Sequence, residues 1–386
     1  MKTKVLIIGA GPSGTACGIR LKKAGIDCLL IDRQSFPRQK LCAGLLTQKS
    51  QECLRQLVGD NDYEHCMKET VSSREEQFTL WHKVGHRIAS CTPVNPITLV
   101  NREQFDQCLV NEYVGLGGMF RDSTELTSID FVGQVAHFKD FDVIYEYLVA
   151  ADGANSTVER LLKKECPDTP ASKRPSSLCL EINVDKKDYD SKGVNIYFGI
   201  VPKSYAWVFS KGNTSCIGLV KLAGEKFDVN ASMRQFLEDL GVKNIEHYPL
   251  HGAMLPIGAY MARPVHWNTL FVGDAAGYVE PLTGEGIYYA LQSGIYAAEA
   301  IADKGTTSSV YVNKVSQLTQ TINKAQKYQE MLENEHLSEL FYRHAHSHTG
   351  FIRYFYQTQI ENSSLDSFWK ILIKYETKFK QLYKYL

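Results

Sequence analysis

The chain lacks an excess of charge of either sign. Its 386 residues carry 43 Lys and Arg against 43 Asp and Glu, so the molecule has no net basic field of the kind that draws proteins to nucleic acids. Long hydrophobic runs are lacking as well. The apolar segment 5–10 is too short for a bilayer span or a signal-peptide core, and it leads into glycine-rich turn residues. We therefore expect neither a nucleic-acid partner nor a transmembrane segment.

Disulfide and metal patterns are also lacking. The ten cysteines are scattered, with no Cys-x-x-Cys pair and no His-flanked spacing of a zinc site. In His344-x-His346-x-His348, neighbouring imidazoles would point to different faces of a helix, which does not favour a metal site. We expect reduced thiols that mostly fill the core of a cytoplasmic protein.

The length exceeds what one hydrophobic core usually supports, which indicates two domains. Residues 4–8 form an apolar strand, residues 13–24 favour a helix that ends at Gly25, and residues 28–31 form a second strand. A βαβ unit with such apolar strands is typical of a parallel sheet buried on both faces. We expect an α/β domain at the start of the chain.

Later segments alternate between this pattern and a different one. Further α/β elements are expected at residues 102–113, 142–151, 270–272 and 286–304, with a helical tail from 311. Antiparallel strands are expected at residues 78–82, 87–91, 179–183, 194–198 and 205–209. The fold class is therefore α/β in the first domain and α+β overall.

The turn after the first strand has the spacing Gly9-x-Gly11-x-x-Gly14, and Asp32 follows 18 residues later at the end of the next strand. The first glycine allows a tight turn, the second lets the backbone approach a pyrophosphate, and the third lets helix and strand pack closely. The phosphates would meet the positive end of the helix, and Asp32 would accept hydrogen bonds from ribose hydroxyls. This context predicts a dinucleotide site, with a ligand-free glycine turn as the minor alternative.

Two later segments separate FAD from NAD. They are Val149-Ala-Ala-Asp152-Gly153-Ala-Asn-Ser156 and Leu270-Phe-Val-Gly273-Asp274-Ala-Ala-Gly277, the second followed by Pro281-Leu-Thr-Gly284-Glu-Gly286. With the opening motif, over residues 1–300, they resemble the FAD-dependent hydroxylase and geranylgeranyl reductase superfamily. The resemblance implies non-covalent FAD on a Rossmann-type FAD/NAD(P)-binding domain, glutathione-reductase-like, with an inserted, mostly antiparallel substrate domain and C-terminal helices.

The same resemblance implies roles for individual residues. Asp274 would bind the ribityl and pyrophosphate part of FAD, residues 281–286 would lie by the isoalloxazine ring, and Arg102 would contact the cofactor. From the residues alone, Asp274 has the alternative of a helix N-cap and Arg102 that of a solvated helix start. Where the superfamily usually has an arginine, this chain has Glu159, followed by Arg160. The expected FAD-binding residues are Gly9, Gly11, Pro12, Ser13, Gly14, Asp32, Arg33, Cys42, Ala43, Gly44, Arg102, Asp152, Gly153, Gly273, Asp274, Pro281, Gly284, Glu285, Gly286 and Ile287.

Two further segments look more like the geranylgeranyl reductases than the aromatic hydroxylases. They are Arg38-x-Lys40-x-Cys42-Ala-Gly44 and Tyr205-x-Trp207-x-Phe209, the second followed by Ser210 where the family has proline. Cys42 is the candidate catalytic residue, because the family places it near the flavin, where a thiol either donates a proton or simply packs. Tyr205, Trp207 and Phe209 share one face of a strand and form either the wall of an apolar substrate pocket or ordinary sheet core.

The expected domain boundaries follow from these assignments. Residues 1–75, 99–170 and 260–305 would form the discontinuous FAD-binding domain, residues 76–98 and 171–259 the substrate domain, and residues 306–386 a C-terminal helical region. Residues 368–386 carry five lysines against one glutamate and several aromatics. They would either rest on an anionic membrane surface or pack on their own domain.

The leading functional hypothesis is FAD-dependent reduction of C=C bonds in a prenyl or lipid-like apolar substrate. An FAD-dependent monooxygenase is the enzymatic alternative, and a flavin-binding lipid or interaction module without turnover is the other. Because no second glycine-rich βαβ unit is present, we expect the reductant to be transiently bound NAD(P)H or a ferredoxin-like donor. The sequence does not specify the substrate or the oligomeric state.

Overall fold

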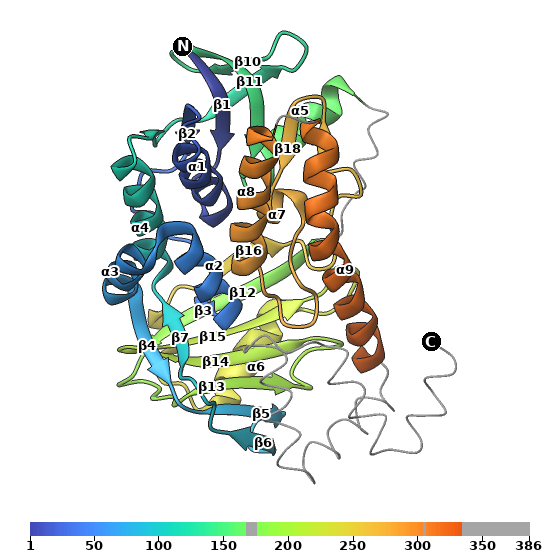
Figure 1. Ribbon diagram of the computed structural model, residues 1–386. Helices are drawn as coiled ribbons and strands as arrows, with labels where there is room; N and C mark the ends of the chain where they lie inside the picture. Colours follow the sequence, from blue (N-terminus) through green and yellow to red (C-terminus); the bar gives the residue numbers. More distant parts are fainter. Residues whose placement is uncertain (167–175, 304–305, 334–386) are drawn as a thin grey trace.

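The computed structural model describes residues 1–166, 176–303 and 306–333. Figure 1 shows two tiers, with a mostly parallel sheet and its helices above and an antiparallel sheet below. The predictions at His344, His346 and His348 and at residues 368–386 lie outside the described residues. In the part of the chain that is described, no helix is both long and apolar enough to cross a membrane.

The upper tier is the predicted Rossmann-type fold. Its sheet has the order β17-β18-β11-β1-β2-β8, and β9 and β10 extend β11 as an antiparallel flap. The strands are β1 (Lys2–Ile8), β2 (Cys28–Ile31), β8 (Met119–Arg121), β9 (Leu126–Asp130), β10 (Val135–Phe138), β11 (Asp142–Ala150), β17 (Val265–His266) and β18 (Thr269–Phe271). The helices of this tier are α1 (Pro12–Lys23), α4 (Arg102–Gly115), α5 (Thr157–Glu165), α7 (Gly273–Ala276) and α8 (Ile287–Ala302).

Parallel pairing brings the ends of the central strands to one level. Ile8 at the end of β1 lies opposite Ile31 of β2 and Ala150 of β11, and Ala150 in turn lies opposite Phe271 of β18. The polar residues that follow these strands therefore meet at one edge of the sheet. In open α/β sheets this edge is where ligands bind.

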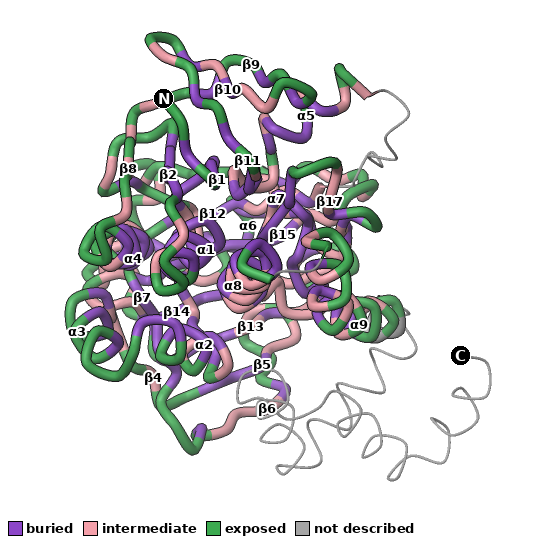
Figure 2. The backbone as a smooth tube through the Cα atoms, turned by 45° about the horizontal axis from the view of Figure 1, so that its top comes forward, coloured by how far each residue is buried: buried purple, intermediate pink, exposed green. Residues whose placement is uncertain are grey.

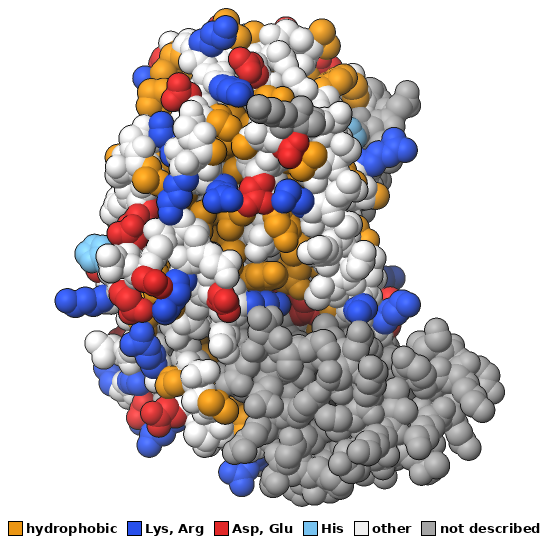
Figure 3. All heavy atoms as spheres, viewed as in Figure 1, with side chains coloured by type: hydrophobic (Ala, Val, Ile, Leu, Met, Phe, Trp, Pro, Cys, Tyr) orange, Lys and Arg blue, Asp and Glu red, His pale blue; other side chains and the backbone are white. Residues whose placement is uncertain are grey.

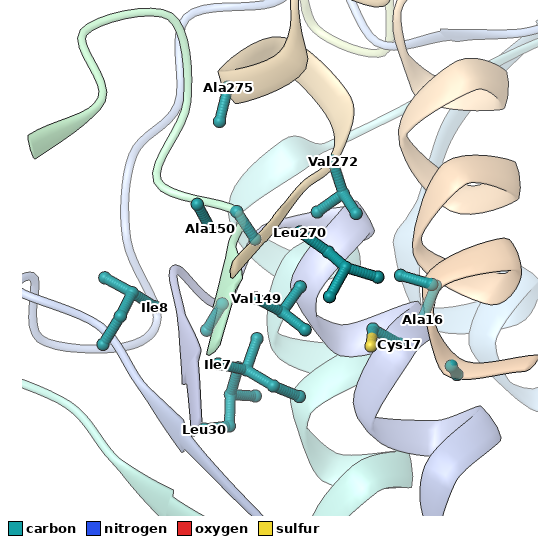
Figure 4. Packing of buried hydrophobic residues seen from close by; sticks show 14 of the residues in the cluster. Ile7, Ile8, Ala16, Cys17, Leu30, Val149, Ala150, Leu270, Val272 and Ala275 are labelled. Atoms are coloured by element: carbon teal, nitrogen blue, oxygen red, sulfur yellow. The ribbon is translucent and has the colours of Figure 1, made fainter. Parts of the chain in front are cut away.

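The core lies between this sheet and the helices. Ile7, Leu30, Val149 and Leu270 come from four adjacent strands and are fully buried beside Cys17 of α1 (Figure 4). Helix α8 approaches α1 closely because Gly294 has no side chain, and a Cβ there would lie 2.1 Å from the carbonyl oxygen of Ser13. Buried segments accordingly concentrate in the centre of the molecule and exposed turns at its rim (Figure 2).

The lower tier is a seven-stranded sheet with the order β16-β12-β15-β14-β13-β5-β6. Its strands are β5 (Phe78–His82), β6 (Arg87–Cys91), β12 (Ser177–Asp185), β13 (Val194–Phe198), β14 (Tyr205–Lys211), β15 (Thr214–Lys221) and β16 (His251–Leu255). The hairpin β5–β6 forms as predicted, but β5 pairs in parallel with β13. Helix α6 (Val229–Leu240) covers one face of the sheet through Phe236 and Leu237, which pack with Ile217. The other face turns toward the upper tier.

A small three-stranded sheet that the sequence pattern did not indicate joins the tiers. It contains β3 (Leu45–Leu46), β4 (Val71–Glu75) and β7 (Ile97–Val100), with β7 in the middle. Helices α2 (Gln48–Val58) and α3 (Asp60–Thr70) connect β3 to β4, and α9 (Thr307–Glu333) follows α8. The domain boundaries given above remain a prediction. Charged side chains of both signs are scattered over the face in Figure 3, in keeping with the balanced composition.

Candidate functional site

One continuous cavity runs from the carboxyl ends of the Rossmann strands to the inner face of the lower sheet. It brings together most of the residues predicted to hold FAD. The predicted residues that line it are Gly9, Gly11, Pro12, Ser13, Asp32, Arg33, Cys42, Ala43, Gly44, Arg102, Asp152, Gly153, Asp274, Gly284, Glu285, Gly286 and Ile287. Gly14, Gly273 and Pro281 do not line it. The cavity thus gathers residues that lie far apart in the chain.

The three glycines of the opening motif have different surroundings. Gly9 has a φ of +106°, and a Cβ at Gly14 would lie 1.9 Å from the carbonyl oxygen of Gly9. These two positions require glycine for the backbone turn and for close helix packing. A Cβ on Gly11, in contrast, would meet only the Arg38 guanidinium, at 3.3 Å. The absence of a side chain at Gly11 therefore leaves room for a ligand rather than for the protein's own chain.

Asp32 is tied to the glycine turn. One carboxylate oxygen accepts a hydrogen bond from the backbone N–H of Ala10 at 2.8 Å, and the other accepts one from Gln34 at 2.9 Å. The side chain is therefore held rigidly at the end of β2 and borders the cavity. We propose that its remaining acceptor capacity serves the ribose hydroxyls of FAD.

A buried ion network lies next to this turn. Arg102 donates two hydrogen bonds to the Asp106 carboxylate, both at 3.0 Å, and Arg38 contacts the same carboxylate at 3.0 Å. Asp106 is fully buried and Arg38 is 8% exposed. Burial alone would lower the pKa of Arg102, but Asp106 and the neighbouring Cys42 raise it above its usual value. The Arg102 guanidinium therefore stays charged at the cavity.

Arg38 is a candidate cofactor-site residue that sequence reasoning missed. It belongs to the Arg38-x-Lys40-x-Cys42-Ala-Gly44 segment, but the sequence pattern assigned no cofactor role to it. Its guanidinium faces Gly11, and its buried Nε has no hydrogen-bond partner. The guanidinium has ion-pair contacts with Asp106 at 3.0 Å and with Asp32 at 3.9 Å, but a buried donor atom without a hydrogen-bond partner, beside a glycine turn, fits the diphosphate of a dinucleotide. Thr124 and Glu125 also line the cavity after the edge strand β8, which is too short to stand out in the sequence.

Asp152 has a structural task as well as a place on the cavity wall. Its carboxylate accepts hydrogen bonds from the Ser156 hydroxyl at 2.6 Å and from the backbone N–H of Thr157 at 2.7 Å, at the start of α5. Glu159 is buried and pairs with Lys163 at 3.0 Å, whereas Arg160 is exposed. Arg160 does not line the cavity, so it does not take over the family arginine's position.

The loop expected beside the flavin ring, residues 281–286, is fixed by contacts of two glutamate side chains. Glu280 is buried, and its carboxylate accepts hydrogen bonds from the backbone N–H groups of Leu282 and Thr283. Glu285, at the cavity, contacts Lys49 at 2.5 Å and accepts a hydrogen bond from Thr47. These contacts fix a backbone that leads directly into the N-terminus of α8, whose free N–H groups favour negative charge.

Asp274 belongs to the first turn of the short helix α7, whose N-cap is Val272, so the N-cap alternative is wrong. Its carboxylate borders the cavity, 3.6 Å from the position of a Cβ on Gly286. We predict that Asp274→Ala weakens FAD binding roughly ten- to a hundredfold, about 1.5–3 kcal/mol, because a charge-assisted hydrogen bond is lost. Fluorescence titration of apoprotein with FAD measures this. Unchanged affinity would exclude a direct contact.

Tyr205, Trp207 and Phe209 all line the cavity from β14. Trp207 is 5% exposed and Phe209 6%, and both pack in a hydrophobic cluster with Leu80 and Val194. The two interpretations of this stripe are therefore compatible, since the same side chains form sheet core and cavity wall. Tyr205 donates a hydrogen bond to the carbonyl oxygen of Thr283, which connects the wall to the loop expected beside the flavin ring. All ten cysteines are free thiols, and Cys42 is partly buried at the cavity.

The residues at the upper end of the cavity fit FAD. They supply an open glycine turn, two buried guanidinium groups and a helix N-terminus, which are the donors that a dinucleotide diphosphate needs. Comparison with known proteins agrees. Residues 2–310 match the model of the FAD binding domain family.

Curated relatives and solved structures resemble the chain over most of its length. A digeranylgeranylglycerophospholipid reductase of Methanosphaera stadtmanae is 28% identical over 368 residues, covering 88% of this chain and 91% of its own. A menaquinone reductase of Mycolicibacterium smegmatis is 27% identical, with 79% and 78% covered. The structure of a geranylgeranyl bacteriochlorophyll reductase-like protein of Thermoplasma acidophilum matches with a TM-score of 0.79 at 17% identity, covering 100% of this chain and 99% of its own. The chain belongs to the FAD binding domain family and is an FAD-dependent oxidoreductase whose distant relatives include geranylgeranyl reductases.

Proposed function

We propose that the protein reduces C=C bonds of a prenyl or other lipid-like substrate. The observation that carries this proposal is the apolar sheet wall that continues the cavity beyond the FAD-binding residues. Its apolar members are Phe78, Leu80, Val194, Ile196, Phe198, Tyr205, Trp207, Phe209, Val220 and Leu255. Such a wall favours a hydrocarbon chain over a polar substrate.

The names of the relatives support the same substrate class. They include reductases of digeranylgeranylglycerophospholipid, of geranylgeranyl diphosphate and of menaquinone. Reduced FAD would supply the hydride for the alkene. Cys42 lies within reach of Arg102 at the junction of the FAD-binding region and the apolar wall. We propose that its thiol contributes to substrate or flavin positioning there, and that NAD(P)H or a ferredoxin-like protein reduces the flavin.

The test is an anaerobic half-reaction. The purified flavoprotein is reduced and then mixed with a polyprenyl alkene such as geranylgeraniol, and flavin oxidation is followed by absorbance. Oxidation by the alkene without oxygen supports the proposal. Oxygen uptake that depends on an aromatic substrate would instead indicate the monooxygenase alternative, and inertness toward both would indicate a binding module.

A cavity-filling substitution tests the wall itself. Ile196 is partly buried on the cavity side of β13, so Ile196→Trp should place an indole where the substrate chain must lie. We predict at least about tenfold slower oxidation by the alkene with unchanged FAD content, because a misfit of a few carbon atoms in an apolar pocket costs that much. Ile144→Trp is the matched control, since Ile144 is 48% exposed on β11. Equal rates for wild type and Ile196→Trp would contradict the pocket.

A further inference from the structure

The apolar wall of the cavity contains one carboxyl group among the sheet residues that the structure describes, that of Glu181. Glu181 lies in the middle of β12, opposite His251 of β16 and Gly218 of β15, and the same row continues through Trp207 of β14. It is 3% exposed, and its Oε2 has no hydrogen-bond partner. A buried polar atom without a partner at the edge of a cavity calls for a functional explanation.

Because Gly218 has no side chain, the Trp207 indole can lie over it, between β14 and the Glu181 carboxyl on β12. A Cβ on Gly218 would lie 2.2 Å from the Trp207 indole, which therefore occupies the space above the glycine. The indole and the neighbouring cavity side chains keep water away from Glu181. A substrate chain that lies along the wall would pass directly over the row that holds both residues.

Polar and charged groups on β12 and on the neighbouring strands affect the pKa of Glu181. Burial raises the pKa of the Glu181 carboxyl, while Lys211 of β14, Cys216 of β15, Asn183 of β12 and His251 of β16 act in the opposite direction. Burial is the largest of these effects, and the pKa lies above its ordinary value. The carboxyl thus holds its proton to higher pH than an exposed glutamate does.

The position of Glu181 relative to the flavin loop follows from the sheet register. Cys179, two residues earlier on β12, lies opposite Val220 of β15, and Tyr205, two residues before Trp207 on β14, donates a hydrogen bond to Thr283 of that loop. Side chains two residues apart on one strand repeat at about 7 Å. Glu181 is therefore displaced from Tyr205, the wall residue that contacts the loop expected beside the ring, by about 7 Å along the strands and by two strands, roughly 10 Å, across the sheet.

We propose that Glu181 is the acid that protonates the substrate alkene. This rests on the proposed reductase function. The π bond of the alkene would break, one carbon would receive the hydride that bound reduced FAD would supply, and the other would form a C–H bond with the proton from Oε2. The O–H bond of the carboxyl breaks, a carboxylate remains, and solvent reprotonates it while an external two-electron donor restores the reduced flavin.

Glu181→Gln tests the proposal because it preserves the shape of the side chain and removes the acidic proton. With geranylgeraniol under anaerobic conditions, oxidation of the reduced flavin should be at least about a hundredfold slower than in wild type, the usual contribution of a general acid. The wild-type rate should fall as pH rises through the pKa of Glu181, and the residual rate of the variant should not. Glu238→Gln, on the exposed side of α6, is the matched control and should behave as wild type.

A second measurement does not depend on turnover. Infrared difference spectra of wild type against Glu181→Gln, without substrate, should contain the C=O band of a protonated carboxylic acid that shifts in D2O and disappears at high pH. Absence of that band at the pH of the alkene assay, or equal alkene rates in wild type and Glu181→Gln, would overturn the role of Glu181 alone. If wild-type protein is not oxidised by the alkene, the reductase function itself is overturned, and the proton transfer with it.

Discussion

Gly11→Val should produce a folded protein that no longer retains FAD. The position has free space apart from the Arg38 guanidinium at 3.3 Å, so the fold tolerates the new side chain. The valine methyl groups, however, would fill the space where the backbone must approach the pyrophosphate. We expect FAD affinity to fall by more than about a hundredfold, since both the contact with the turn and that with Arg38 are lost. Flavin absorbance per protein after gel filtration measures the retention.

Two other glycines make this experiment specific. Gly115→Val is the matched control, because no atom lies within 4 Å of its Cβ position and it lies at the end of α4. That variant should keep its FAD. Gly14→Ala should behave differently from both, because its methyl group would lie 1.9 Å from the Gly9 carbonyl oxygen and destabilise the fold. A Gly11→Val protein with stoichiometric FAD would show that the pyrophosphate does not lie on this turn.

Asp106→Asn should have the largest effect on stability. Its carboxylate is fully buried and is shared by the guanidinium groups of Arg38 and Arg102. An amide would leave Arg102 without its counter-charge and Arg38 with only the Asp32 carboxylate, 3.9 Å away, and removing one partner of a buried ion pair costs about 3–5 kcal/mol. Urea unfolding of the apoprotein should report this loss. FAD binding should weaken as well, because both arginines at the cavity lose their positions.

The control for Asp106 is Asp239→Asn, an exposed position on α6. A change there should alter the free energy of unfolding by no more than about 0.5 kcal/mol. If Asp106→Asn were equally mild, the network would not be an important support of the fold. Titration of Asp106→Asn with FAD distinguishes a role in stability from a role in cofactor binding. If the network only stabilised the fold, the FAD affinity of the folded fraction would be unchanged.

Much of the upper tier was predictable because its signals are local. The strand at β1, the turn at Gly9 and the helix at α1 follow one another in the chain, and the period of the apolar residues separates strand from helix. Parallel pairing then brings Asp32, Asp152 and Asp274 to one edge without further information. The hairpin β5–β6 was predictable for the same reason, since its two strands flank a glycine turn.

Other features depend on pairs of residues that lie far apart in the chain. The parallel pairing of β5 with β13 joins strands more than a hundred residues apart, and no local pattern encodes that choice. The triad of Arg38, Asp106 and Arg102 spans the FAD-binding region in the same way. Its members look like ordinary surface charges in the sequence, because burial is a property of the packed molecule and not of the residue type.

The sequence by itself determined a dinucleotide site on a Rossmann-type domain, because backbone requirements at glycines and strand ends leave a fixed spacing, and FAD as the dinucleotide followed from the resemblance of two later segments to a known superfamily. Only the tertiary structure placed the unpartnered Oε2 of Glu181 on the wall of the cavity. In the sequence, Glu181 is one polar residue within a mostly apolar strand. Strand alternation shows which residues share its side of the sheet, but not what packs against that side. Its environment was decided by the packing of the two tiers against each other, which excludes water from the carboxyl and so changes its chemistry.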